Sequence, residues 1–112
     1  MQIDIQARGF ALTPGLRMHV EHRLRFALGR FQDRLMRVVV CLSDVNGPRG
    51  GVDKLCQVQL RLHGLPDIVV KDAEADLYVA VDRAAERAGR TLRRHLRRAY
   101  GDFDNRPIWS DE

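Results

Sequence analysis

The chain has 112 residues and no apolar run long enough to cross a bilayer. Its first residues also lack the charged start and apolar core of a signal peptide. We therefore expect a cytoplasmic protein with no membrane partner. Cysteine is scarce too, since only Cys41 and Cys56 are present, each within an apolar stretch. In a cytoplasmic protein such cysteines are expected to be reduced, buried and apolar in character, which argues against a disulfide framework.

The sequence has no recognisable catalytic or metal-binding constellation. His19 and His22 are three residues apart, the other histidines and cysteines are scattered, and no CxxC or HxxxH spacing occurs. The glycine-rich stretch 46–51 lacks the Lys-Ser/Thr ending of a phosphate-binding loop and falls between two predicted strands. No serine, cysteine or carboxylate pair stands in a triad or dyad setting. We expect no metal, no cofactor, no small-molecule substrate and no enzymatic activity.

Lysine is nearly absent, because Lys54 and Lys71 are the only lysines among 19 basic residues. The formal net charge is +4, yet residues 101–112 carry four carboxylates against Arg106 alone. The rest of the chain is therefore more basic than the total suggests. A hydrophobic content of 45% and a charged content of 30% are typical of a globular protein. The sequence predicts one folded domain over residues 1–100 and an acidic, flexible tail over 101–112.

The run from Asp76 to Ala99 predicts one long helix with a narrow apolar face. That face repeats at spacings of three and four: Leu77, Val81, Ala84, Ala88, Leu92, Leu96 and Ala99. A second face repeats arginine at the same spacings: Arg83, Arg87, Arg90, Arg94 and Arg97. Arg93 and Arg98 flank this row and are expected to lie nearer the apolar face. Only Glu86 supplies an acid within the arginine-bearing part.

A row of like charges at helical spacing is destabilising, whereas mixed signs would stabilise the helix. The arginine row therefore indicates a polyanionic partner. The planar guanidinium matches phosphate oxygens, so nucleic acid is the leading candidate. The alternative interpretation is a solvated helix face that happens to be basic.

The remaining patterns predict the element order β-α-β-β-β-α. Residues 2–8 alternate as a half-buried strand, and Thr13 with Pro14 begins a helix that is expected to reach Gln32. Three further strands are predicted at 37–42, 55–63 and 68–71, the first of them central because it is apolar throughout. The stretch 44–51 reads as a hairpin tip. We expect an α+β fold in which two amphipathic helices pack on one face of a four-stranded sheet.

Other surface residues have weaker claims to a binding role. Arg17, His22 and Arg25 on the first helix could extend the basic surface, although Glu21 lies among them. Tyr78 could stack on a base, but packing at a helix start is the more common role of such a tyrosine. The outward residues of the third strand could touch RNA or a protein, or form a polar solvated face: Gln57, Gln59, Arg61 and His63.

Several short motifs, in order, resemble one known family. They are Met1-Gln2-Ile3, Leu12-Thr13, Leu16-Arg17, Phe31-Gln32-Asp33-Arg34, the stretch Glu74 to Asp82, and the basic string Arg90 to Arg98. From Met1 to about Arg98 the chain resembles the short forms of the ribosome hibernation-promoting factors, also called sigma-54 modulation or ribosomal subunit interface proteins. The loop at 43–53 is longer and richer in glycine than in the short members, and the tail with Trp109 has no counterpart that we can match.

The resemblance implies the β-α-β-β-β-α fold and binding to the small ribosomal subunit in the channel for transfer RNA and messenger RNA. There the basic helices would contact ribosomal RNA and keep the ribosome idle under stress. It leaves open whether ribosomes are paired or silenced singly, and it does not give the oligomeric state. A second hypothesis is a protein-interaction module, in which the basic helix and the 43–53 loop bind an acidic partner or mediate self-association.

Overall fold

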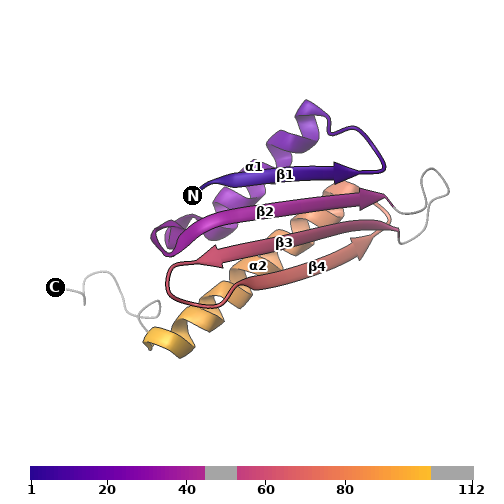
Figure 1. The fold of residues 1–112 in the computed structure, drawn as a ribbon. Coiled ribbons are helices and arrows are strands. Elements are labelled where there is room, and N and C mark those ends of the chain that lie inside the picture. The colour runs from indigo at the N-terminus through magenta and orange to yellow at the C-terminus, as the bar shows by residue number, and fades with distance from the viewer. Residues whose placement is uncertain (45–52, 102–112) are drawn as a thin grey trace.

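The computed structural model describes residues 1–44 and 53–101. Its elements follow one another in the predicted order (Figure 1). They are β1 (Ile3–Arg8), α1 (Pro14–Leu28), the 3-10 helix η1 (Gly29–Arg34), β2 (Leu35–Asp44), β3 (Lys54–Leu62), β4 (Ile68–Glu74) and α2 (Leu77–Tyr100). The predicted hairpin tip and acidic tail fall on residues 45–52 and 102–112, which lie outside the described part. In that part no helix is long and apolar enough to cross a membrane.

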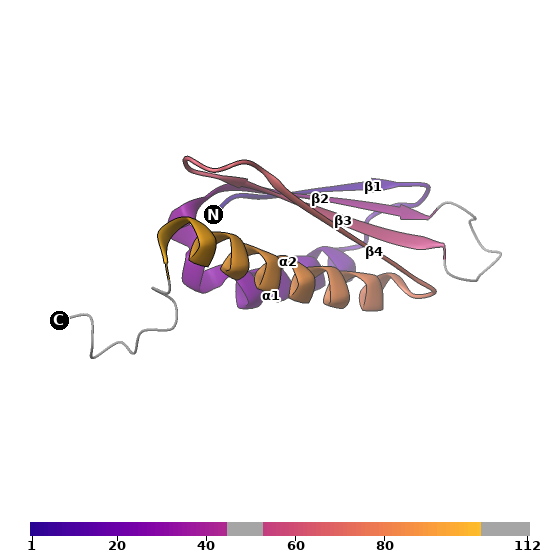
Figure 2. The ribbon, with the colours of Figure 1, turned by 90° about the horizontal axis from the view of Figure 1, so that it is seen from below.

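The four strands form one sheet in the order β1-β2-β3-β4. β1 and β2 are parallel, while β3 is antiparallel to both of its neighbours. The apolar strand β2 is therefore internal, as its composition predicts. On β3 the predicted alternation is confirmed, because Cys56, Val58, Leu60 and Leu62 are all buried. Both helices cover the face of the sheet that carries these buried side chains (Figure 2).

Two strands run further than their hydrophobic patterns indicate. β2 extends from Leu35 to Asp44, and β4 extends to Glu74 rather than ending at Lys71. The backbone of β4 keeps pairing with β3 as far as Glu74, which lies opposite Lys54. A pattern of apolar residues cannot detect such an extension, because the ladder hydrogen bonds of a strand do not depend on its side chains. The extension is important for the site, since it carries two carboxylates alongside α2.

Helix α1 begins as predicted, with the Thr13 side chain accepting a hydrogen bond from the Leu16 amide at 3.1 Å. It ends at Leu28, however, and not at Gln32. The chain tightens into η1, where Phe31 has non-helical backbone angles (φ −115°, ψ 15°). Phe31 is still buried as expected, because the turn directs its ring into the core.

Helix α2 begins after Asp76, whose carboxylate accepts from the amides of Tyr78 and Val79. Its buried face is wider than the predicted stripe, since Ala80, Ala85 and Gly89 are buried as well. Ala99 was expected on this face but is exposed, because the last turn of α2 extends past the edge of the sheet (Figure 1). Small side chains on α2 allow the helix to lie close to both the sheet and α1.

One glycine is fixed by a close approach at the end of the sheet. Gly9 has φ +88°, and a Cβ there would lie 2.8 Å from the carbonyl oxygen of Asp44.

The two cysteines differ in burial. Cys56 is buried, and burial raises the pKa of its thiol to about 12. Cys41 is only half-buried, contrary to expectation, because its place in the register opposite Gln57 puts it on the uncovered face.

Candidate nucleic-acid interface

The arginines of α2 lie on the part of the helix that is turned away from the core. Arg83, Arg87 and Arg90 are exposed, and so are Arg93, Arg94 and Arg98. Arg97 is half-buried, and its Nε atom is inaccessible to solvent. Arg97, a member of the predicted row, is thus more buried than Arg93 and Arg98, which were expected to lie nearer the apolar face.

Two arginines near the start of α2 have carboxylate partners on β4. The Nε atom of Arg83 lies 3.5 Å from a carboxylate oxygen of Glu74, and an Nη atom of Arg87 lies 3.6 Å from Asp72. Arg87 also donates a hydrogen bond of 2.7 Å to the carbonyl of Lys71. Sequence spacing suggests that Glu86 is the sole acidic neighbour of the arginine row, and for this half of the helix that interpretation is wrong. The acids come from a strand that precedes the helix.

The same two carboxylates interact with each other. The protonated Glu74 carboxyl can donate a hydrogen bond to the Asp72 carboxylate, which raises the pKa of Glu74; partial burial and the Asp72 charge raise it further, against the opposing effect of Arg83. This pair of acids holds Arg83 and Arg87 against the edge of the sheet. Both arginines are thus partly neutralised before any partner approaches.

The second half of α2 has a different charge balance. Within the described ranges 1–44 and 53–101, no carboxylate lies within ion-pairing distance of Arg90, Arg94 or Arg98. These three arginines recur every four residues, so they lie along one line on the helix surface. Arg90 and Arg94 belong to the predicted row and Arg98 to its flank, and no carboxylate of the described residues offsets their charge.

Helix α1 lies beside α2 and runs in the same direction. Near their first turns, Asp82 of α2 contacts His19 Nε2 at 2.7 Å and Arg23 Nε at 3.1 Å. Further along, a Cβ on Gly89 would lie 3.1 Å from the carbonyl oxygen of Ala27. These contacts fix which face of α1 borders the arginines of α2. It is the face that carries His19, Arg23 and Ala27.

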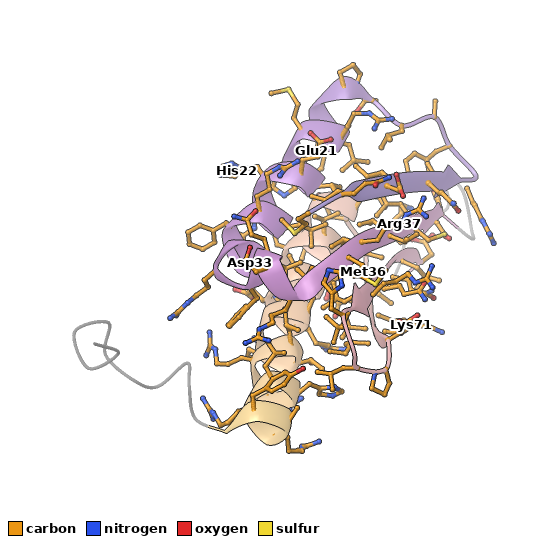
Figure 3. The ribbon with its side chains drawn as sticks, turned by 60° about the vertical axis from the view of Figure 1, so that its left-hand side comes forward. Glu21, His22, Asp33, Met36, Arg37 and Lys71 are labelled. Carbon is orange, nitrogen blue, oxygen red and sulfur yellow. The ribbon has the colours of Figure 1, made fainter. Side chains whose placement is uncertain are left out.

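Arg17, His22 and Arg25 are exposed on α1, as predicted, but they do not line the boundary with α2. Figure 3 shows His22 on the helix side of the molecule and Arg37 and Lys71 on the sheet side. The α1 residues that border α2 are others, among them His19, Arg23 and Ala27. Binding roles for Arg17, His22 and Arg25 stay predictions.

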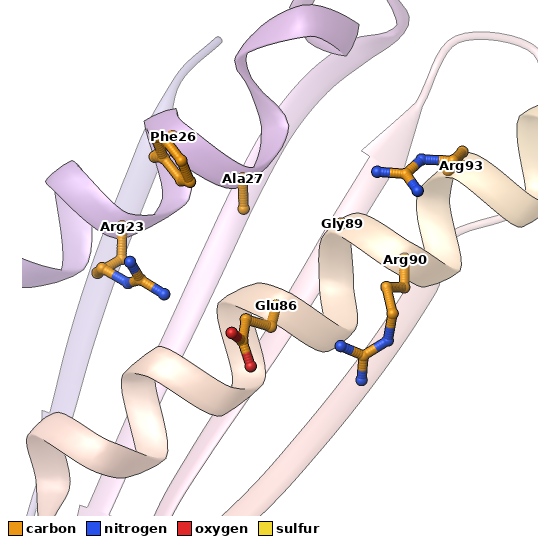
Figure 4. Close-up of a pocket in the computed structure, with 7 residues that line it drawn as sticks. All are labelled: Arg23, Phe26, Ala27, Glu86, Gly89, Arg90 and Arg93. Atoms are coloured by element: carbon orange, nitrogen blue, oxygen red, sulfur yellow. The ribbon is translucent and has the colours of Figure 1, made fainter. Parts of the chain in front are cut away.

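The boundary between the helices contains a hollow of about 210 Å³ (Figure 4). It is lined by Arg23, Phe26 and Ala27 of α1, and by Glu86, Gly89, Arg90 and Arg93 of α2. Phe26 is 78% exposed, and the guanidinium carbon of Arg23 lies 6.0 Å from its ring centroid. Arg23 and Phe26 were not singled out from the sequence. The sequence feature that could have indicated them is an aromatic residue outside the apolar face of the helix, about one turn after an arginine.

Three of the remaining candidates, Tyr78, Gln59 and Arg61, make local contacts. The ring of Tyr78 lies 4.9 Å from that of His19, so the tyrosine packs against α1 while its other side is exposed. On the uncovered face of the sheet, Asp67 accepts a hydrogen bond from Gln59 at 2.9 Å and lies 3.8 Å from Arg61. Nowhere in the described residues do three or more metal-ligating side chains gather into a candidate metal site.

Comparisons with known proteins place the chain in a family. The family model described as sigma 54 modulation protein / S30EA ribosomal protein matches residues 3–100. The comparison with curated proteins gives no match.

Two solved structures are similar to the chain. The N-terminal domain of Protein Y from Thermus thermophilus is 29% identical, with a TM-score of 0.70, and the match covers 85% of this chain and 99% of that one. A ribosomal subunit interface protein from Coxiella burnetii is 19% identical, with a TM-score of 0.69, over 85% of this chain and 97% of that one. The second likeness concerns the fold alone. Because the family model spans nearly all of the described structure, the chain belongs to the sigma 54 modulation / S30EA ribosomal protein family.

Proposed function

We propose that this protein is a non-enzymatic, cytoplasmic ribosome-associated factor that inhibits translation by occupying the small subunit. It binds ribosomal RNA in the channel for transfer RNA and messenger RNA through α2, and it acts in stress-induced ribosome hibernation. The observation that carries the proposal is the line of Arg90, Arg94 and Arg98, which keeps its full charge in a member of this family. Ribosome binding by this chain is inferred from the names of its family and of similar proteins.

The chemistry of the surface supports RNA as the partner. Guanidinium groups spaced one helical turn apart match the phosphates of a folded RNA backbone. Structured RNA is recognised mainly by its shape and phosphates, which requires no base-reading residues on the helix. Arg83 and Arg87 would contribute less, because Glu74 and Asp72 already offset their charge. Arg17, His22 and Arg25 of α1 would act at the margin of the interface, Arg93 would lie beside Arg90 at the hollow, and the half-buried Arg97 would contribute less than its exposed neighbours.

Sedimentation of the protein with purified ribosomes tests the proposal. Wild-type protein should travel with the small subunit and with whole ribosomes, and the double reversal Arg90→Glu with Arg94→Glu should abolish this. The matched control is Arg8→Glu with Lys71→Glu, which makes the same change in charge on the uncovered face of the sheet. The control should sediment like wild type. Loss of binding in both double variants, or in neither, would contradict an interface on α2.

The protein-interaction hypothesis makes a different prediction for the same assay. Complexes held by an acidic protein partner should survive ribonuclease, and mutation of the 43–53 loop or of Trp109 should weaken them more than mutation of α2. Residues 45–52 of that loop lie outside the described residues, so no observation of the structure favours this second function.

A further inference from the structure

The hollow between α1 and α2 has the size of a site for one flat group. At about 210 Å³ it is smaller than the roughly 300–1,000 Å³ typical of small-molecule pockets. Ala27 and Gly89 meet at its floor, where the absence of a side chain on Gly89 lets the two helices approach. The walls rise to longer side chains on either side (Figure 4).

One wall is aromatic. The Phe26 ring is 78% exposed although it borders a concave surface, so its face is accessible to a partner. A single exposed aromatic ring is not unusual on a protein surface, so what distinguishes Phe26 is its place on the wall of a hollow. Stacking of a base on an aromatic face is the interaction by which proteins commonly hold unpaired nucleotides. Arg23, which also contacts Asp82, lies over the ring with its guanidinium carbon 6.0 Å from the centroid, so the cation occupies one face of Phe26 and a base would stack on the other.

The other wall combines a carboxylate with arginine. Among the described side chains, Glu86 has no ion pair within 4.0 Å. A carboxylate would repel a phosphate, so a bare phosphate is a poor occupant of the hollow. The edge of a base is a better one, because its exocyclic amino group can donate a hydrogen bond to a carboxylate. Arg90 and Arg93 stand within reach of the phosphates on either side of such a base.

We propose that this hollow binds a single unpaired nucleobase of a structured RNA, stacked on Phe26 with its amino group facing Glu86. The inference rests on the proposed function and deepens it, because it names the RNA feature that the helix surface selects. A fully paired helix could contact the arginines but could not place a base in the hollow. The protein should therefore prefer RNA with a bulged or looped-out nucleotide.

The test compares two short RNA hairpins that differ by one bulged 2-aminopurine, a fluorescent base that carries an amino group. Affinities are measured by anisotropy of an end label, and stacking is followed by quenching of the 2-aminopurine. Wild-type protein should bind the bulged hairpin roughly tenfold or more tightly, the effect expected from one base–aromatic stack. Quenching should accompany binding.

Three substitutions of exposed side chains make the test specific. Phe26→Ala should remove the preference and the quenching while leaving affinity for the paired hairpin unchanged, and Phe26→Trp should keep both. Met18→Ala is the matched control, because Met18 is a 67% exposed apolar residue on the same helix outside the hollow. It should behave like wild type. Equal affinity of wild-type protein for the two hairpins would overturn the proposal, as would an equal loss on both in Phe26→Ala.

The role proposed for Glu86 is tested by changing the bulged base. Replacing a bulged adenine by a bulged uracil removes the exocyclic amino group, so wild-type protein should bind the uracil hairpin more weakly. Glu86→Gln should reduce the difference in affinity between the adenine and uracil hairpins, and an unchanged difference would overturn the role assigned to Glu86.

The outcomes of these tests can be distinguished from a failure of the proposed function. Ribosome binding without any preference for the bulge refutes only this inference, whereas a preference for the bulge without ribosome binding refutes only the ribosomal assignment.

Discussion

At the scale of single residues, carboxylates on a neighbouring strand determine which arginines of α2 keep their charge. Glu74 and Asp72 face the first half of the helix and pair with Arg83 and Arg87. The arginine of each pair is half-exposed or more, so the pairs add little stability and their effect on the local charge matters more than their effect on folding. They divide one arginine row into a neutralised half and a charged half.

The two acids also predict a dependence of stability on pH. The pKa of Glu74 is raised in the folded protein, chiefly by Asp72, so the folded state binds a proton at a pH at which the unfolded chain has lost it. The contribution of Glu74 to stability therefore increases as pH falls through the raised pKa. Glu74→Gln should be more stable than wild type at pH 7, and this advantage should shrink toward acid pH in urea-unfolding measurements. A variant that is less stable at pH 7 would show that the contact with Arg83 dominates.

At the scale of elements, α2 is shaped by small residues on its buried face. Ala80, Ala84, Ala85, Ala88 and Gly89 are all buried, and Gly89 is the point of contact with the Ala27 backbone. Close approach of the helices places Arg23 and Arg90 around one hollow. The spacing of the helices is thus a property of the site as well as of the core.

Enlarging Gly89 should separate the helices. A Cβ at this position already lies 3.1 Å from the carbonyl oxygen of Ala27, so the branched side chain in Gly89→Val should lower the free energy of unfolding by about 1–3 kcal/mol. Ala99→Val is the control, because Ala99 is exposed on the same helix and should lose only the few tenths of a kcal/mol set by helix propensity. Thermal or urea unfolding measures both. Equal stability of the two variants would contradict close packing at Gly89.

The elements themselves could largely be predicted from the sequence, for physical reasons. The Thr13 cap of α1 and the alternation of β3 are local signals, and the structure confirms them. The wider buried face of α2 could not be predicted, because alanine and glycine are compatible with either side of a helix. The early end of α1 was missed because Phe31 is apolar and buried at the expected spacing, although it belongs to a tighter turn.

At the scale of the whole molecule, the site depends on contacts between distant parts of the chain. The arginine row itself was predicted from sequence, but its pairing with β4 and the participation of Arg23 and Phe26 were not. Both depend on which face of one element meets another, and spacing within a single helix does not contain that information. The family resemblance supplied the expected partner. The structure adds two features that the resemblance did not contain: the second half of α2, where the arginines have no carboxylate partner among the described residues, and the hollow between the helices.

The most direct test of an RNA-binding face on α2 is the salt dependence of binding to isolated small ribosomal subunits. Each phosphate neutralised by an arginine contributes roughly 0.7–0.9 to the slope of log affinity against log salt concentration. Arg94→Gln should weaken binding and reduce that slope by about one, while Arg8→Gln on the uncovered sheet face should leave it unchanged. A wild-type slope near zero, or the same reduction in both variants, would contradict the account.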